Sequence, residues 1–304
     1  MSAALDQRIA ASLGAEVRPE VAAYARMLGD EAGASAVLFY GSNLRTGSLE
    51  GVLDFYVLLP GAQAERIWPK VSYREWEYGG ETLRAKIATM SLAQFAQAAS
   101  GQSRDTTIWT RFVQPSALIW SADDDVRQSV HEAIAAAAKS AARFAAALGP
   151  SEGEAEAEAY WRALFQATYR AEFRVEKPGR EDSILSVNRD HFDGLLPLAW
   201  ETQGIAFSQE GDRLAPQLDE ASRRAILREW REREKLGKAL NILRLAKATT
   251  TFEGAARYGA WKLHRHTGIE LEVTPFREKH PLLAMPGAAW ELWRARRRAA
   301  KAQR

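Results

Sequence analysis

The chain has 304 residues, of which 46% are hydrophobic and 26% charged, and its formal net charge is +2. These values are ordinary for a soluble globular protein and allow one large domain or two modest ones, each with its own core. The near-neutral charge argues against a dedicated nucleic-acid binder, and the absence of cysteine excludes disulfides, thiolate metal sites and a cysteine nucleophile.

The first half of the chain contains most of the strand-like patterns. Helical spacing of apolar residues over 17–32 leads into an apolar strand at 36–40, and a second strand follows at 52–59. Two strand-like runs flank Gly79-Gly80 within residues 72–90, which predicts a β-hairpin. The remaining elements of this half are a helix at 91–99, a loop or edge strand within 109–120, and a long alanine-rich helix at 126–148 that ends at a glycine and a proline.

The second half of the chain has mainly helical patterns. The stretch SEGEAEAEA, residues 151–159, has no apolar face and is typical of a linker between domains. Helices are predicted at 158–175, 182–201 and 219–247. Because strands are concentrated in the first half and helices in the second, we expect an α+β fold, in which a mixed sheet with helices is followed by a mainly helical second domain.

The stretch FYGSNLRTGSLEGVLDFYVLL, residues 39–59, places a glycine turn beside a strand that carries one acid. Glycine lets the backbone approach phosphates closely, and a serine hydroxyl can hold phosphate oxygens. Asp54 lies in an otherwise apolar strand, where a carboxylate is costly to bury unless a positive charge meets it. No histidine spacing is typical of a metal site, so a metal would be held mostly by oxygen, which favours Mg²⁺ or Mn²⁺. Taken alone, this turn and this acid also fit a tight turn beside a solvent-facing aspartate.

Further motifs occur in the same order as in a known enzyme family. After FYGSN and VLDFYVLL come TLRAKIATMSLAQF and TRFVQPSALIW, and later TYRAEFRV and ILSVNRDHF. In this series the chain resembles the mitochondrial-type phosphatidate cytidylyltransferases, the CDP-diacylglycerol synthases of the polymerase-β-type nucleotidyltransferase superfamily. The resemblance covers about residues 36–200, and Ala171-Glu172 stands where the family has glycine and aspartate.

The resemblance implies a domain organisation and a role for each matched residue. It implies a nucleotidyltransferase core over 1–150 and a helical domain that completes the active site over 151–250. The composition of the remaining chain predicts a basic, Trp-bearing C-terminal segment over 251–304. Asp54 and Glu172 are the implied catalytic residues, and together they would bind Mg²⁺ or Mn²⁺. The implied nucleotide- and phosphate-binding residues are Gly41, Ser42, Arg84, Arg111 and Arg174. Lys86 is added to them because it faces the same side as Arg84 in a regular strand.

The function that these roles imply is magnesium-dependent transfer of a cytidylyl group from CTP to phosphatidate or a related lipid phosphate, which yields a CDP-lipid and pyrophosphate. Two alternatives stay open at this point: a nucleotidyltransferase that acts on a soluble acceptor, and a non-catalytic relative that binds a nucleotide or a lipid. Tyr56 stands where many nucleotidyltransferases have a second strand acid, and it therefore leaves the non-catalytic alternative open. A nucleic-acid partner is not expected.

The last part of the sequence indicates contact with an anionic membrane. Trp290 and Trp293 share one helical face, and the last fifteen residues carry six basic side chains and one acid. The alternative is that the tryptophans pack on the protein body and the basic side chains are solvated. The N-terminal segment has no basic region followed by an apolar run, and no window resembles a membrane span. We therefore expect a cytoplasmic protein that binds peripherally to the inner face of the membrane.

Overall fold

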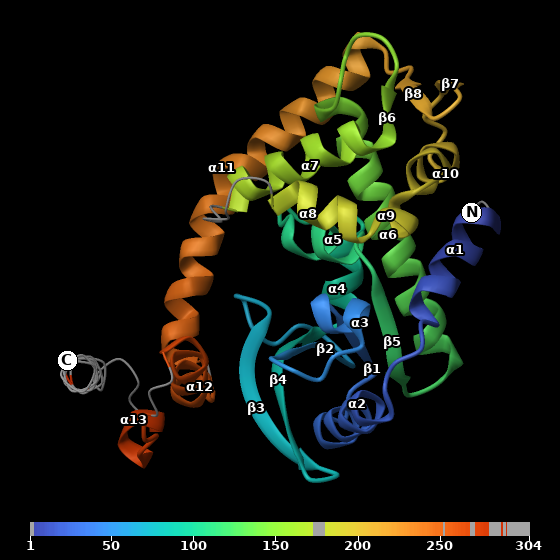
Figure 1. Ribbon diagram of the computed structural model, residues 1–304. Helices are drawn as coiled ribbons and strands as arrows, with labels where there is room; N and C mark the ends of the chain where they lie inside the picture. Colours follow the sequence, from blue (N-terminus) through green and yellow to red (C-terminus); the bar gives the residue numbers. More distant parts are fainter. Residues whose placement is uncertain are drawn as a thin grey trace, which may run out of the picture.

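A computed structural model of the protein describes residues 3–172, 180–251, 253–267 and 271–279, together with Gly287 and Trp290. It confirms the α+β class, with a five-stranded mixed sheet and its helices followed by a largely helical region (Figure 1). The first part contains α1 (Ala3–Leu13), α2 (Pro19–Ala32), β1 (Ala36–Tyr40), α3 (Ser42–Thr46), β2 (Leu53–Leu59), β3 (Lys70–Tyr78), β4 (Glu81–Ser91), α4 (Leu92–Ala99), α5 (Thr107–Phe112), β5 (Ser116–Ser121) and α6 (Asp124–Leu148). The second part contains β6 (Ala155–Glu156), α7 (Ala157–Glu172), α8 (Arg180–Val187), α9 (Arg189–Phe192), α10 (Leu195–Thr202), β7 (Phe207–Glu210), β8 (Arg213–Pro216), α11 (Glu220–Thr251), α12 (Ala255–Thr267) and α13 (Pro275–Lys279).

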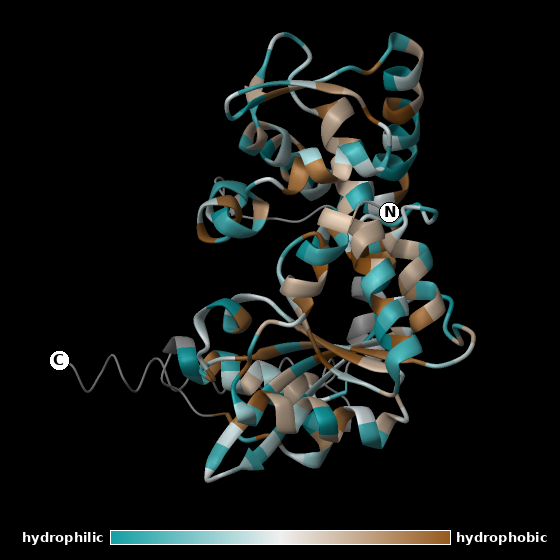
Figure 2. Cartoon of the chain, turned by 90° about the vertical axis from the view of Figure 1, so that its right-hand side faces the viewer, coloured by the Kyte–Doolittle hydropathy of each residue, from teal (hydrophilic) through white to brown (hydrophobic). Residues whose placement is uncertain are grey.

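The five-stranded sheet has the order β3-β4-β2-β1-β5, and in it β2 and β4 are parallel while the other neighbours are antiparallel. Side chains of a strand alternate between its two faces. On one face, residues such as Phe39 and Phe55 form a hydrophobic cluster with α2. On the other, residues such as Leu38 and Tyr56 belong to a larger cluster that includes α4, α5 and α6. Figure 2 shows these hydrophobic strands between layers of helices.

The structure confirms most of the predicted local elements and corrects three details. The hairpin 72–90 is β3–β4, and β5 is an edge strand, as expected. The segment Trp109–Phe112, however, belongs to α5. Ile108, Trp109 and Phe112 have helical spacing, and together they form one helix face that is buried against the core.

The other two corrections concern the second half of the chain. The predicted linker 151–159 contributes β6, which pairs with β8 in a small sheet of order β6-β8-β7. The predicted helix 182–201 is divided into α8, α9 and α10. Gly194 precedes α10 with a φ of 67°, a conformation that ends the preceding helical run.

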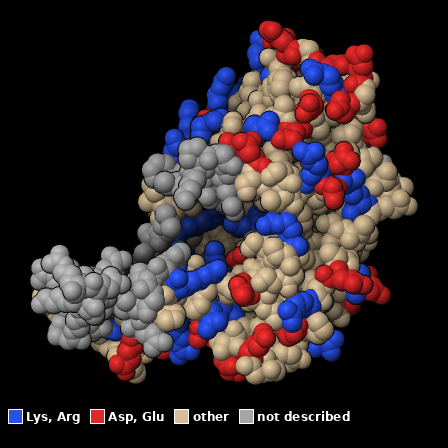
Figure 3. Space-filling view, in the orientation of Figure 1, with Lys and Arg blue, Asp and Glu red and all other residues tan. Residues whose placement is uncertain are grey.

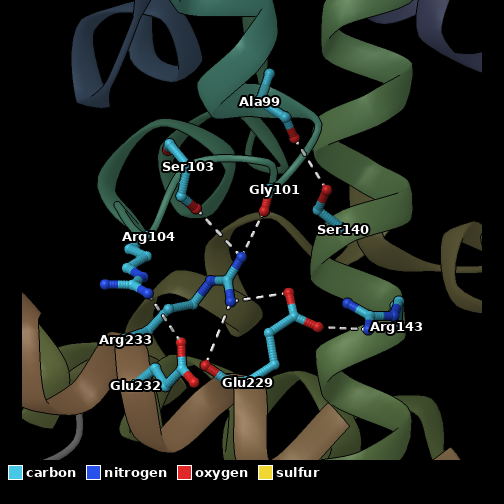
Figure 4. Close-up of polar contacts among 9 residues, drawn as sticks. All are labelled: Ala99, Gly101, Ser103, Arg104, Ser140, Arg143, Glu229, Glu232 and Arg233. Atoms are coloured by element: carbon cyan, nitrogen blue, oxygen red, sulfur yellow. Dashed lines mark hydrogen bonds and ion pairs between the residues drawn. The ribbon is translucent and has the colours of Figure 1, made fainter. Parts of the chain in front are cut away.

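The helix α11 runs along the helical region and is attached to it by polar contacts. Buried Arg233 donates to the carbonyl oxygens of Gly101 and Ser103 and pairs with Glu229 at 2.8 Å (Figure 4). Glu229 also pairs with Arg143 of α6 at 2.5 Å. This network positions α11 against α6 and the loop before α5.

Further along, α11 passes the end of α7 and the loop before β3. Asn241 donates to the backbone carbonyl of Glu172, and Arg244 donates to the carbonyl oxygen of Trp68 at 2.9 Å and pairs with Asp105 at 2.5 Å. Gly237 lies where an added Cβ would be 2.5 Å from the carbonyl oxygen of Ala171, so the two helices approach closely here. Within the described part of the chain, no helix has the length and hydropathy that crossing a membrane requires.

Candidate functional site

A cavity of about 390 Å³ opens where the end of β1, the strand β2, α5 and α8 meet. In the space-filling view, Lys and Arg side chains surround a hollow at the centre of this face (Figure 3). The cavity is lined by Tyr40, Gly41, Ser42, Arg45, Asp54, Thr110, Arg111, Gln114, Pro115, Tyr169, Ser183, Ile184, Val187 and Asn188.

The turn between β1 and α3 forms one wall of the cavity. Gly41 has a φ of 90°, and a Cβ added there would lie 3.1 Å from Oδ2 of Asp54. Both the backbone conformation and the close approach therefore require glycine. The loop that follows is fixed by Asn43, whose Nδ2 donates to the carbonyl oxygens of Ser48 and Glu50, each at 2.8 Å.

Asp54 is held on β2 between the two neighbouring strands. It pairs in register with Tyr40 of β1 and with Lys86 of β4. Burial raises the pKa of the Asp54 carboxyl, and the positive charges of Lys86 and Arg111 oppose that rise. The described residues donate no hydrogen bond to this carboxylate, and none of them forms an ion pair with it. Its oxygens are thus available to a ligand in the cavity.

Arg111 faces the same cavity from the last turn of α5. Its guanidinium lies 5.5 Å from the ring centre of Tyr40 and 6.0 Å from that of Tyr56, whose hydroxyl it reaches at 3.5 Å. Burial lowers the pKa of Arg111, but the surrounding groups outweigh that effect. Tyr40 and Tyr56, and then the acids Glu172 and Asp54, hold the pKa above its ordinary value. Arg111 is therefore charged, and among the described residues no carboxylate forms an ion pair with it.

The structure brings four of the predicted site residues, Gly41, Ser42, Asp54 and Arg111, to this cavity. Three others lie outside its lining. Buried Glu172 accepts a hydrogen bond from the Thr106 hydroxyl at 2.7 Å and acts on Arg111 through its charge. Arg84 pairs with Glu75 at 3.4 Å and lies 5.8 Å from the ring centre of Trp261, and Lys86 adjoins Asp54 in the sheet. The predicted residue Arg174 lies outside the described residues.

The donor set of the cavity suits a hard cation. Asp54 supplies a carboxylate to which none of the described residues donates a hydrogen bond, and Ser42 supplies a hydroxyl. Mg²⁺ and Mn²⁺ prefer oxygen ligands of these kinds. Within the described ranges, no group of three His, Cys, Asp or Glu side chains is arranged to hold a metal. A cation in this cavity would therefore be held by Asp54 together with a ligand's own oxygens, and Glu172 as a second metal ligand stays a prediction.

Sequence reasoning did not assign several lining residues. Arg45 lies four residues after Gly41 on α3, and its spacing from the glycine turn could have indicated it. Thr110 and Gln114 flank Arg111 within a predicted motif. Ile184, Val187 and Asn188 lie within the matched motif ILSVNRDHF, but no role was assigned to them, because α8 is more than 120 residues from Asp54 in the chain and no local pattern places it at the glycine turn.

Comparison with known proteins adds a weak structural similarity. The solved structure of a nucleotidyltransferase-like protein from Exiguobacterium sibiricum 255-15 matches 82% of this chain and 88% of that chain, with 10% sequence identity and a TM-score of 0.23. No protein-family model and no curated protein matches the chain. These findings give no family-level assignment, so the proposal below depends on the geometry of the cavity and on the sequence motifs.

Proposed function

We propose that the protein is a nucleotidyltransferase that binds CTP in this cavity and transfers its cytidylyl group to phosphatidate or a related lipid phosphate. One observation carries the proposal: Asp54 and Arg111 line the same cavity beside the Gly41-Ser42 turn, and neither is ion-paired to a described residue. A magnesium nucleotide presents the complementary pair of charges, a cation for the carboxylate and phosphate oxygens for the guanidinium. The choice of CTP and of a lipid acceptor comes from the motif resemblance.

In this mechanism the residues of the chain bind and orient the reactants. Gly41 and Ser42 hold the β- and γ-phosphates, while Arg111 and Arg45 neutralise phosphate charge. An oxygen of the acceptor phosphate attacks the α-phosphorus of CTP, the bond from that phosphorus to the bridging oxygen breaks, and pyrophosphate leaves. A divalent cation held by Asp54 supplies charge neutralisation when bound. Positioning and electrostatic stabilisation thus provide most of the rate acceleration.

A basic stripe on α11 supports the proposed anionic membrane partner. Arg224, Arg228, Arg231, Lys235 and Lys238 are exposed and recur every three or four residues, so they share one helical face about 21 Å long. The described residues form no ion pair with these five side chains. In Figure 3, Lys and Arg side chains gather along the edge where α11 runs.

Beyond the stripe, Ile242 and Leu243 are 56% and 50% exposed. Each basic residue near an anionic bilayer contributes about 1 kcal/mol of binding, and exposed apolar side chains can enter the interface. Trp290 is also exposed, whereas Trp293 and the C-terminal arginines lie outside the described residues.

The test of this function incubates the protein with labelled CTP, Mg²⁺ and phosphatidate vesicles, and measures label in the lipid phase and release of pyrophosphate. The wild type should form the labelled lipid, and Asp54→Asn should not. Asp212→Asn, at an exposed position, is the matched control and should keep the activity. Pyrophosphate release with a sugar phosphate but not with phosphatidate would support the soluble-acceptor alternative, and CTP binding without turnover would support a non-catalytic protein.

A further inference from the structure

Asp105 is a buried acid that joins α11 to the start of α5. Its carboxylate is 5% exposed and pairs with the Arg244 guanidinium at 2.5 Å. The same carboxylate accepts from the backbone amide of Thr107 at 2.9 Å and from the Thr107 hydroxyl at 2.5 Å. Arg244 in turn donates to the carbonyl oxygen of Trp68 at 2.9 Å, and its guanidinium lies 5.0 Å from the centre of the Trp68 ring. Because a buried carboxylate is costly unless it is paired, this junction fixes where α5 begins relative to α11.

The next residue, Thr106, links this junction to the end of α7. Its hydroxyl donates to Oε1 of Glu172 at 2.7 Å, and both side chains are buried. Asn241 of α11 donates to the backbone carbonyl oxygen of the same glutamate. Polar contacts therefore tie α11, the end of α7 and the start of α5 together, one short helix before Arg111.

Tyr56 connects the junction to the cavity. It stands two residues after Asp54 on β2, so the two side chains share one face of the sheet. The buried Tyr56 hydroxyl accepts from the Arg111 guanidinium at 3.5 Å. Burial raises the pKa of this hydroxyl and Asp105 adds to the rise, while Arg111 and Arg244 oppose it. Tyr56 is therefore within electrostatic reach of both the Arg111 guanidinium and the Asp105–Arg244 ion pair.

We propose that Asp105 and Arg244 are positioning residues for nucleotide binding, which orient the Arg111 guanidinium toward the cavity although neither of them lines it. The pair acts through the two parts of the fold that meet Arg111, which are the helix α5 and the Tyr56 hydroxyl. Arg111 needs such indirect support, because no carboxylate of the described residues holds its direction. A misplacement of about 1 Å at a reacting group can cost ~100-fold in rate. The inference rests on the proposed function, since it concerns the contact between Arg111 and the nucleotide.

The test is a double-mutant cycle on CTP affinity, measured by calorimetric titration of the full-length protein in the presence of Mg²⁺. Arg244→Met and Asp105→Asn should each weaken CTP binding about tenfold. In an Arg111→Met background the same changes should alter the affinity by less than about twofold, because the contact that they orient is already absent. Glu232→Gln is the matched control. It breaks the exposed pair with Arg104, which joins the same two segments at 3.4 Å, and it should keep the wild-type affinity.

The outcomes separate this inference from the proposed function and from a purely structural role. Unchanged CTP affinity in Arg244→Met and Asp105→Asn overturns the inference alone. An equal loss in the wild-type and Arg111→Met backgrounds also overturns it, because a destabilised protein would bind more weakly in both. If Arg244→Met does not fold, the nearly isosteric Asp105→Asn decides the test, and if Arg111→Met binds too weakly to titrate, Arg111→Lys supplies the background. Failure of the wild type to bind CTP overturns the proposed function, and this inference with it.

Discussion

Replacing Gly41 by alanine tests whether the glycine turn and the Asp54 carboxylate form one site. At a φ of 90° and a ψ of −164°, Gly41 occupies a region that is nearly restricted to glycine, and a side chain there costs about 1–3 kcal/mol of folding free energy. The added Cβ would also lie 3.1 Å from Oδ2 of Asp54, so the turn or the carboxylate must move. Losing one charge-assisted contact costs about 1.5–3 kcal/mol, or roughly 10- to 100-fold in affinity for magnesium CTP.

Gly47 offers a matched control at the other end of α3. It has a φ of 66°, and nothing lies within 4 Å of a Cβ added there. Gly47→Ala should therefore lower the unfolding free energy by about 1–2 kcal/mol and leave CTP affinity unchanged. Urea denaturation followed by tryptophan fluorescence measures the stability of each variant, and calorimetry measures CTP binding. Equal CTP affinity in Gly41→Ala and wild type, or an equal loss in Gly47→Ala, would refute the reasoning.

Three further predictions concern α11. Glu229→Gln should lower the unfolding free energy by about 1–3 kcal/mol by leaving buried Arg233 without its carboxylate. Burial raises the pKa of Glu229, but its arginine partners outweigh this effect and hold the pKa below its ordinary 4.5. The loss of unfolding free energy in Glu229→Gln, measured by urea denaturation at pH 7, should therefore shrink as the pH falls below 4.5. An equal loss at pH 7 and pH 3 would contradict this. Gly237→Ala should lower the melting temperature, because its Cβ would overlap a carbonyl of α7. If calorimetry gives the variant the same melting temperature as the wild type, α11 and α7 can move apart without loss of stability, and the prediction is wrong. The double change Lys235→Glu and Lys238→Glu should reduce sedimentation with anionic vesicles and leave folding intact, and undiminished sedimentation would exclude this face of α11 as a membrane contact.

The part of the site that could be predicted from the sequence is the part built from one continuous stretch. Gly41 directly follows β1 and Asp54 lies near the start of the adjacent strand β2, so the periodicity of the strands and the glycine turn already place them side by side. Arg111 could be assigned only through a motif resemblance, because its approach to Asp54 depends on how α5 packs on the sheet.

The sequence motifs include the lining residues of α5 and α8, but the meeting of these two segments at the cavity could not be predicted, for a physical reason. Asn188 lines the cavity because α7 and α8 pack back over α5, and that packing arises from long-range burial of residues such as Trp161 and Leu185. The small sheet was missed for a similar reason. β6 has only two paired residues, and its partner strand β8 is more than 50 residues away, so it has no period of its own.

The central claim is that the Asp54 carboxylate and the Arg111 guanidinium bind one metal nucleotide together. Its most direct test is the Mg²⁺ dependence of CTP binding, measured by calorimetry for the wild type and for Asp54→Asn. The affinity of the wild type should rise when Mg²⁺ replaces EDTA, whereas Asp54→Asn should show no rise and keep the metal-free affinity that Arg111 provides. An equal response to Mg²⁺ in both proteins, or no CTP binding by the wild type, would contradict the account.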